Sequence, residues 1–236
     1  MGISRYLAMT AAEMEAFSVP ENAFPAYMAC HFSPYAIGLS NVPTGLPAES
    51  MLIVNDRTPP WGHDPVQITR QLLQLFEQVR FSCLLLDFER PEVAECQRLC
   101  QEILRQLPCP VGVSEGYAGE LDCAVFLGPP PLDQTLEAYT APWKGRELWL
   151  DVAPEAACIT VTENGNCMAS VPFSVPPENT FTDDALHCRY RAKVFENEIQ
   201  FHLWRDLQQI EALTEHAKSL GITKCISLFQ ELYYDK

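Results

Sequence analysis

The sequence contains no long apolar run and little positive charge. No hydrophobic stretch reaches the roughly 20 residues that span a bilayer, and the start, MGISRYLAMTAAEMEAF, lacks the unbroken apolar core of a secretory signal. Sixteen basic residues stand against 31 acidic ones, and the net charge of −15 repels phosphate backbones and anionic membrane surfaces. We therefore expect no nucleic-acid partner, no membrane partner and a cytoplasmic location.

Cofactor motifs are also missing from the sequence. The ten cysteines form no CxxC pair and lie in apolar runs such as SCLLLDF and LDCAVFL, which indicates buried small side chains rather than disulfides or zinc ligands. No glycine-rich fingerprint of a nucleotide, flavin or nicotinamide site follows any apolar run. We predict no cofactor and assign no metal ligand.

The order of apolar and amphipathic segments predicts an α/β fold. Short apolar runs alternate with helical patterns, and this alternation is typical of a parallel sheet. The chain of 236 residues matches a (β/α)8 TIM-type barrel of roughly 200 to 250 residues, so we predict one barrel domain over 1–236. Residues 26–40 should supply the first barrel strands, and later strands are expected at 51–54, 83–88, 110–115, 123–128, 146–152 and 224–229. Helices are expected at 66–79, 92–107, 132–139 and 206–219.

A different pattern interrupts this alternation between the seventh strand and the last helix. The segment contains ITVT, an Asn164-Gly165 turn, MASV, and later HCRYRAKV and IQFHLW around a turn-like ENE. Such features indicate β-hairpins. We therefore predict a small antiparallel β insertion at 155–205.

Polar residues at the ends of the predicted strands are the candidates for chemistry, because the active site of a (β/α) barrel lies at the carboxyl ends of its strands. In LLLDFE, side chains alternate, so Leu85, Asp87 and Glu89 should face the interior together. Such a carboxylate pair can separate its pKa values into an acid and a charged group. The other candidates at strand ends are Asn55, Asp56, Glu115, Asp151, Gln230 and Glu231.

Two segments carry a resemblance to a known family. LLLDFERP at 84–91 resembles the fourth-strand signature of glycoside hydrolase family 18, an Asp-x-Asp-x-Glu run. The stretch 201–232 resembles the closing helix and strand of that family, and 188–204 resembles the insertion hairpin of its spore-cortex-cleaving subgroup. The resemblance implies that Glu89 is the catalytic acid and that Asp87 orients the 2-acetamido group of the substrate. It also implies N-acetylated amino-sugar oligomers or peptidoglycan fragments (muropeptides) as substrates.

The sequence departs from that family pattern in ways that indicate a degenerate site. Ser82 and Leu85 stand at the positions of two upstream aspartates, and residues 128–130, Gly-Pro-Pro, replace a Tyr-Asp pair that binds the acetamido group. Proline offers no side-chain donor or acceptor. Each oriented donor is worth about 10²- to 10³-fold in rate, so the resemblance implies reduced catalysis. Phe229 takes the place of the final-strand Trp and can still stack on a sugar.

Three hypotheses for the function remain open. The first is a diverged glycoside hydrolase with Glu89 as acid and a sugar-binding groove lined by Trp61 and Phe229. The second is a catalytically inactive barrel that binds carbohydrate or a protein partner. The third is a divalent-metal site, because carboxylates are oxygen ligands of the kind that hold magnesium, manganese or calcium. Its candidate ligands are Asp56, Asp87, Glu89, Glu115 and Glu231.

Overall fold

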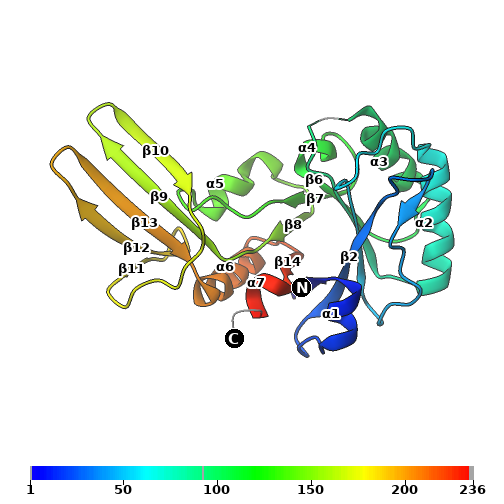
Figure 1. Ribbon diagram of the computed structural model, residues 1–236, viewed down its shortest axis with the longest axis horizontal. Helices are drawn as coiled ribbons and strands as arrows, with labels where there is room; N and C mark the ends of the chain where they lie inside the picture. Colours follow the sequence, from blue (N-terminus) through cyan, green and yellow to red (C-terminus); the bar gives the residue numbers. More distant parts are fainter. Residues whose placement is uncertain (1, 92, 234–236) are drawn as a thin grey trace.

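The computed structural model describes residues 2–91 and 93–233. Its centre is a closed barrel of parallel strands, in which β1 pairs with both β14 and β2 (Figure 1). This confirms the predicted (β/α)8 barrel. In barrel order the strands are β1 (Ser4–Met9), β2 (Phe24–Phe32), β4 (Met51–Asn55), β5 (Cys83–Asp87), β6 (Val111–Ser114), β7 (Ala124–Leu127), β8 (Leu148–Asp151) and β14 (Lys224–Leu228).

The first strand lies earlier in the chain than the sequence analysis expected. β1 is Ser4–Met9, whereas 26–40 holds only β2 and the two-residue β3 (Leu39–Ser40), which pairs antiparallel with β2. The prediction that 26–40 supplies the first strands is therefore wrong for β1. SRYLAM does not read as a strand in the sequence because it begins with two polar, partly buried residues, Ser4 and Arg5. It therefore lacks the continuous apolar run of the other strands.

Three long helices cover the barrel: α2 (Pro65–Val79), α3 (Ala94–Gln106) and α6 (Leu207–Ser219). Asp64 caps α2 by accepting a hydrogen bond from the backbone of Val66, and Pro65 occupies the first helical position. The remaining helical segments are short: α1 (Ala11–Ala16), α4 (Glu115–Ala118), α5 (Leu136–Thr140), η1 (Ala141–Trp143) and α7 (Phe229–Tyr233). No helix in the described part of the chain is long and apolar enough to cross a membrane.

A separate antiparallel sheet lies between β8 and α6 and projects from the barrel on the left of Figure 1. The predicted insertion between the seventh strand and the last helix is thus confirmed. Arg205, which is 1% exposed, joins this sheet to the barrel: its guanidinium pairs with Glu155 and donates to the carbonyl oxygen of Pro130 at 2.7 Å. In sheet order the strands are β10 (Gly165–Ser170), β9 (Glu155–Thr162), β13 (Glu198–Arg205), β12 (Cys188–Val194) and β11 (Phe181–Asp183).

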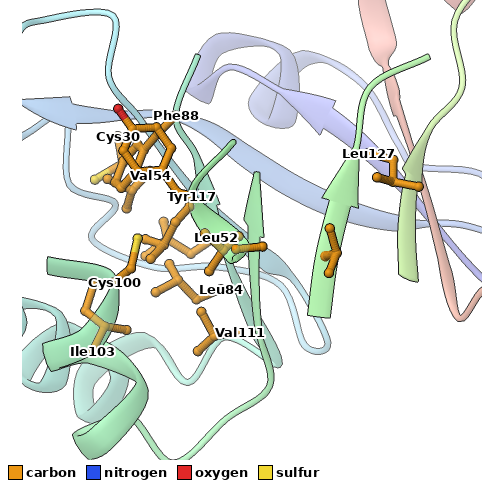
Figure 2. Packing of buried hydrophobic residues seen from close by; sticks show 14 of the residues in the cluster. Cys30, Leu52, Val54, Leu84, Phe88, Cys100, Ile103, Val111, Tyr117 and Leu127 are labelled. Carbon is orange, nitrogen blue, oxygen red and sulfur yellow. The ribbon is translucent and has the colours of Figure 1, made fainter. Parts of the chain in front are cut away.

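Apolar side chains form two layers, one inside the barrel and one between strands and helices. Figure 2 shows the outer layer, where Leu52, Leu84 and Val111 of the strands face Cys100 and Ile103 of α3. Inside the barrel, Leu85 packs with Ile53, Phe126, Trp149 and Ile226. Strand β5 therefore alternates as predicted, and its interior face continues from Leu85 toward the carboxyl end of the barrel.

Candidate functional site

A pocket of about 560 Å³ opens at the carboxyl ends of the barrel strands. Its size is within the ordinary range for small-ligand sites. The floor is apolar, with Ile53, Leu85, Phe126 and Ile226 among its residues. The polar side chains of the lining come from β4, β5, β6, β8 and the segments that follow β5 and β6, and they are Asn55, Asp87, Glu89, Arg90, Ser114, Glu115, Tyr117 and Asp151.

Asp87 ends β5 on the interior face of the barrel, where it is mostly buried. Its Oδ1 lies 3.4 Å from the hydroxyl of Ser114, the last residue of β6. Burial and, next, the charge of Glu89 raise the pKa of Asp87 to about 6, although the contact with Ser114 opposes this rise. Asp87 therefore titrates close to neutral pH, and it does so beside a second carboxylate.

Glu89 lies two residues beyond Asp87, and its exposed side chain lines the same pocket. A buried carboxylate fixes its backbone: Asp56 accepts hydrogen bonds from the N–H of Glu89 at 3.1 Å and from the N–H of Arg90 at 2.9 Å. Arg90 in turn donates from Nε to the carbonyl oxygen of Asp56 at 2.9 Å. The loop after β4 thus holds the loop after β5 in place.

The far wall of the pocket carries a second titratable group. Asp151 ends β8, three strands away from β5 around the barrel. Burial is the largest cause that raises its pKa to about 7, followed by the charges of Glu231, Asp87 and Glu155. The charge of Asp87 is one of the causes that raise the pKa of Asp151, so it acts on Asp151 across the mouth of the barrel.

Two further predicted residues line the pocket. Glu115 begins α4 directly after β6 and is exposed there. Asn55 is largely occupied by local hydrogen bonds, because it donates to the carbonyl oxygen of Met28 at 2.9 Å and accepts from the N–H of Arg57 at 3.2 Å. Asn55 therefore shapes the wall, whereas Glu115 is available to a ligand.

The structure places the other predicted residues away from the pocket lining. Asp56 is 4% exposed and faces backbone N–H groups. Trp61 is 67% exposed on the loop before α2. Phe229 is 4% exposed in α7, where it packs with Leu7 and Met9. The expected groove of Trp61 and Phe229 therefore does not line this pocket.

The last two predicted residues also belong to α7. Gln230 donates from Nε2 to the Glu13 carboxylate at 2.9 Å, so it ties α7 to α1. Glu231 lines a separate hollow beside Pro154 and Leu207, although its charge still raises the pKa of Asp151. Gln230 and Glu231 lie outside the lining of the main pocket because α7 begins immediately after β14.

Sequence reasoning overlooked several polar groups at the site. Ser114 and Arg90 were adjacent to predicted residues, and their positions at strand ends were an available signal. Tyr139 had no such signal because it lies on α5. Its hydroxyl donates to the carbonyl oxygen of Gly128 at 3.2 Å, and burial, then the nearby charges of Glu115, Asp151 and Glu155, raises its pKa. Tyr139 thus supplies a hydroxyl next to a strand end that carries no polar side chain.

The hypothesis of a divalent-metal site finds no support in the side-chain geometry. Within residues 2–91 and 93–233, no group of three or more His, Cys, Asp or Glu side chains is arranged to hold a metal ion. Asp56, one of the proposed ligands, is already satisfied by two backbone donors.

Comparison with known proteins identifies the fold. No family model matches the sequence, and no curated protein does either. Among solved structures, a family 18 chitinase variant from Cycas revoluta in complex with (GlcNAc)4 superposes with a TM-score of 0.60 at 11% identity, covering 98% of this chain and 96% of that one. The barrel has the family 18 chitinase fold.

Two more structures share this family 18 fold. A chitinase-like agglutinin from Robinia pseudoacacia gives a TM-score of 0.59 at 12% identity, with 96% of each chain covered. The spore cortex-lytic enzyme SleL of Bacillus cereus gives 0.57 at 13% identity, covering 96% of this chain and 70% of that one. At identities this low, the superpositions establish the fold alone. The resemblance seen in the sequence is therefore confirmed for the fold.

The structure also shows what fills the sites of departure from the family 18 pattern. Leu85 is 1% exposed among apolar side chains inside the barrel. Ser82 lies at the opposite end of β5, where its hydroxyl donates to the carbonyl oxygens of Glu49 and Ser50 at 2.9 and 3.0 Å. Neither residue places charge beneath Asp87, so the raised pKa of Asp87 comes from burial and from the acids around the pocket mouth.

Proposed function

We propose that this glycoside hydrolase-like barrel cleaves amino-sugar oligomers in the pocket, with Glu89 as the general acid. The observation that carries the proposal is that Asp87, at the end of β5, and Glu89, two residues further on, both line one pocket with an apolar floor. Burial and the charge of Glu89 raise the pKa of Asp87 to about 6, so Asp87 can hold a proton beside Glu89 near neutral pH. The substrates are oligomers with 2-acetamido groups, either N-acetylglucosamine oligomers or peptidoglycan fragments.

The proposed reaction needs one protein acid. Glu89 gives its proton to the glycosidic oxygen as the bond from that oxygen to the anomeric carbon breaks. The acetamido oxygen of the substrate attacks the same carbon and forms a cyclic intermediate, while Asp87 binds the acetamido N–H. Water then opens the intermediate and returns a proton to Glu89. No second nucleophilic carboxylate is required in such substrate-assisted hydrolysis.

The hydrogen bonds around the two acids suit these roles. Asp56 anchors the backbone of Glu89, and Ser114 contacts the Asp87 carboxylate, so the backbone of the acid and the second carboxylate are held in place before substrate binds. Preorganised groups lower the barrier because little reorganisation remains to be done in the transition state.

The second candidate function is carbohydrate binding without cleavage. It is favoured by the end of β7, where Gly128 and Pro129 line the pocket without a polar side chain. It is also consistent with the shared fold of the Robinia pseudoacacia chitinase-like agglutinin. A binding barrel would use the same pocket, but it would not depend on proton donation by Glu89.

One set of variants separates these functions. Thermal denaturation of wild type, Glu89→Gln and Glu77→Gln is measured with N-acetylglucosamine oligomers and with muropeptides, and a product assay follows for each ligand that stabilises the protein. Glu77 is an exposed residue of α2, so its variant controls for the loss of one charge. We expect stabilisation of all three proteins and turnover in all but Glu89→Gln. Stabilisation without any turnover indicates a binding barrel, and no stabilisation by either ligand refutes both functions.

A further inference from the structure

The pocket contains more acidic than basic side chains. Four carboxylates line it, and they belong to Asp87, Glu89, Glu115 and Asp151. Arg90 is the basic residue of that lining. Its guanidinium is held by the loop after β4, because Nε donates to the carbonyl oxygen of Asp56 and a terminal nitrogen donates to that of Arg57 at 3.1 Å. The positive charge is therefore fixed at one rim, and none of the described residues that line the opposite wall is basic.

Asp151 is the carboxylate best placed to contact a ligand on that opposite wall. It lines the pocket at the end of β8, where a backbone hydrogen bond from Val152 opposes the rise in its pKa. Three further acids act on it, namely Asp87 across the barrel mouth, Glu231 on α7 and Glu155 on β9. A cation bound there would relieve this repulsion, whereas a ligand anion would add to it.

We propose that the pocket selects amino-sugar oligomers by charge, with Asp151 as the specificity-determining residue. It prefers partly de-N-acetylated oligomers, whose glucosamine ammonium pairs with Asp151, over fully N-acetylated oligomers. Muropeptides with free carboxylates bind most weakly. This inference rests on the proposed function and narrows its two substrate classes to one.

The physical basis is the difference between a neutral and a charge-assisted contact. An N-acetyl group offers Asp151 one neutral N–H donor, whereas an ammonium offers a full charge and three donors. Charge-assisted hydrogen bonds are shorter and roughly twice as strong as neutral ones. The apolar floor beneath, with Leu85 and Phe126, removes water from one side of the pair, while the mouth of the pocket stays open to solvent. A muropeptide carboxylate meets four acids, and Arg90 is the basic side chain that the described lining offers it.

Calorimetric titration tests this ranking with three ligands: N-acetylglucosamine tetramer, a tetramer containing glucosamine, and a muropeptide with free carboxylates. Wild type, Asp151→Asn and Asp122→Asn are compared at low and high salt. Asp122 is an exposed residue at the other end of the barrel, just before β7, so its variant has the same net charge as Asp151→Asn without a change in the pocket. We expect wild type to bind the glucosamine tetramer roughly tenfold more tightly than the N-acetylated one. High salt should reduce the difference.

The results of this titration distinguish charge selection by Asp151 from the proposed function on which it rests. Asp151→Asn should lose most of the preference while it still binds the N-acetylated tetramer, and Asp122→Asn should keep the preference. Equal affinities for all three ligands, or tightest binding of the muropeptide, would overturn charge selection and leave the proposed function standing. Failure of every oligomer to bind would overturn both.

Discussion

Replacement of Asp87 by Asn should stabilise the protein at neutral and alkaline pH. Burial and the charge of Glu89 raise the pKa of Asp87 from its ordinary value of 3.8 to about 6. The folded state therefore binds this proton more tightly than the unfolded state does. As the pH rises from about 4 to above 6, the folded state must hold an unfavourable charge, and the free energy of unfolding falls. The Asn variant avoids this loss.

The size of the effect follows from the two pKa values. The interval from 3.8 to about 6, at about 1.4 kcal/mol per pH unit, corresponds to about 3 kcal/mol as an upper bound. Because the pocket is open to solvent, which screens the charge, we expect a gain of about 1 to 3 kcal/mol at about pH 8. At about pH 4 the gain should shrink to less than about 1 kcal/mol, since Asp87 is then protonated in the folded state.

Urea unfolding of wild type and Asp87→Asn at these two pH values measures the gain directly. Asp122→Asn, which neutralises an exposed acid at the other end of the barrel, is the control for net charge. A gain in stability that is the same at both pH values, or a loss of stability at about pH 8, would show that burial and Glu89 do not disfavour the charged form of Asp87. The expected gain in stability should be accompanied by loss of turnover, because Asn cannot supply the charge of Asp87.

Two further substitutions test the parts that support the pocket. Gly112→Ala should lower the free energy of unfolding by about 1 to 3 kcal/mol, because the new Cβ would lie 2.2 Å from a ring carbon of the fully buried Trp149. Gly116→Ala is the control, because its new Cβ meets nothing within 4 Å and should leave the stability unchanged. Equal urea midpoints for the two variants would contradict this packing. Asp56→Asn should lower the free energy of unfolding by about 1 to 3 kcal/mol, because one of two backbone donors loses its acceptor. Because Asp56 anchors the backbone of Glu89, kcat of this variant should fall more than KM rises, and unchanged kcat would argue against a positioning role for Asp56.

Most of the barrel could be predicted from the sequence because a strand buried on both faces must be apolar throughout. CLLLDF and CAVFLG show this directly. The insertion was recognisable from the Asn164-Gly165 pair, although the turn between β9 and β10 consists of Glu163 and Asn164 and Gly165 is the first residue of β10. β1 was not recognisable, because SRYLAM begins with polar residues that remain partly exposed.

The site was predictable only as far as strand periodicity reaches. Alternation along β5 placed Leu85 and Asp87 on the interior face, and both line the pocket. Periodicity does not reveal what a polar side chain contacts after a strand ends. Asp56 faces backbone N–H groups, and Phe229 lies in α7, which starts where β14 ends. Both residues therefore support the structure near the pocket without lining it.

A crystal structure of Glu89→Gln with N-acetylglucosamine tetramer tests the carbohydrate site most directly. A sugar ring should lie above the floor formed by Ile53 and Leu85, with its acetamido group at Asp87 and its glycosidic oxygen within hydrogen-bond distance of residue 89. A sugar bound elsewhere, for example on the exposed Trp61 or on the antiparallel sheet, would contradict the assignment of this pocket as the carbohydrate site.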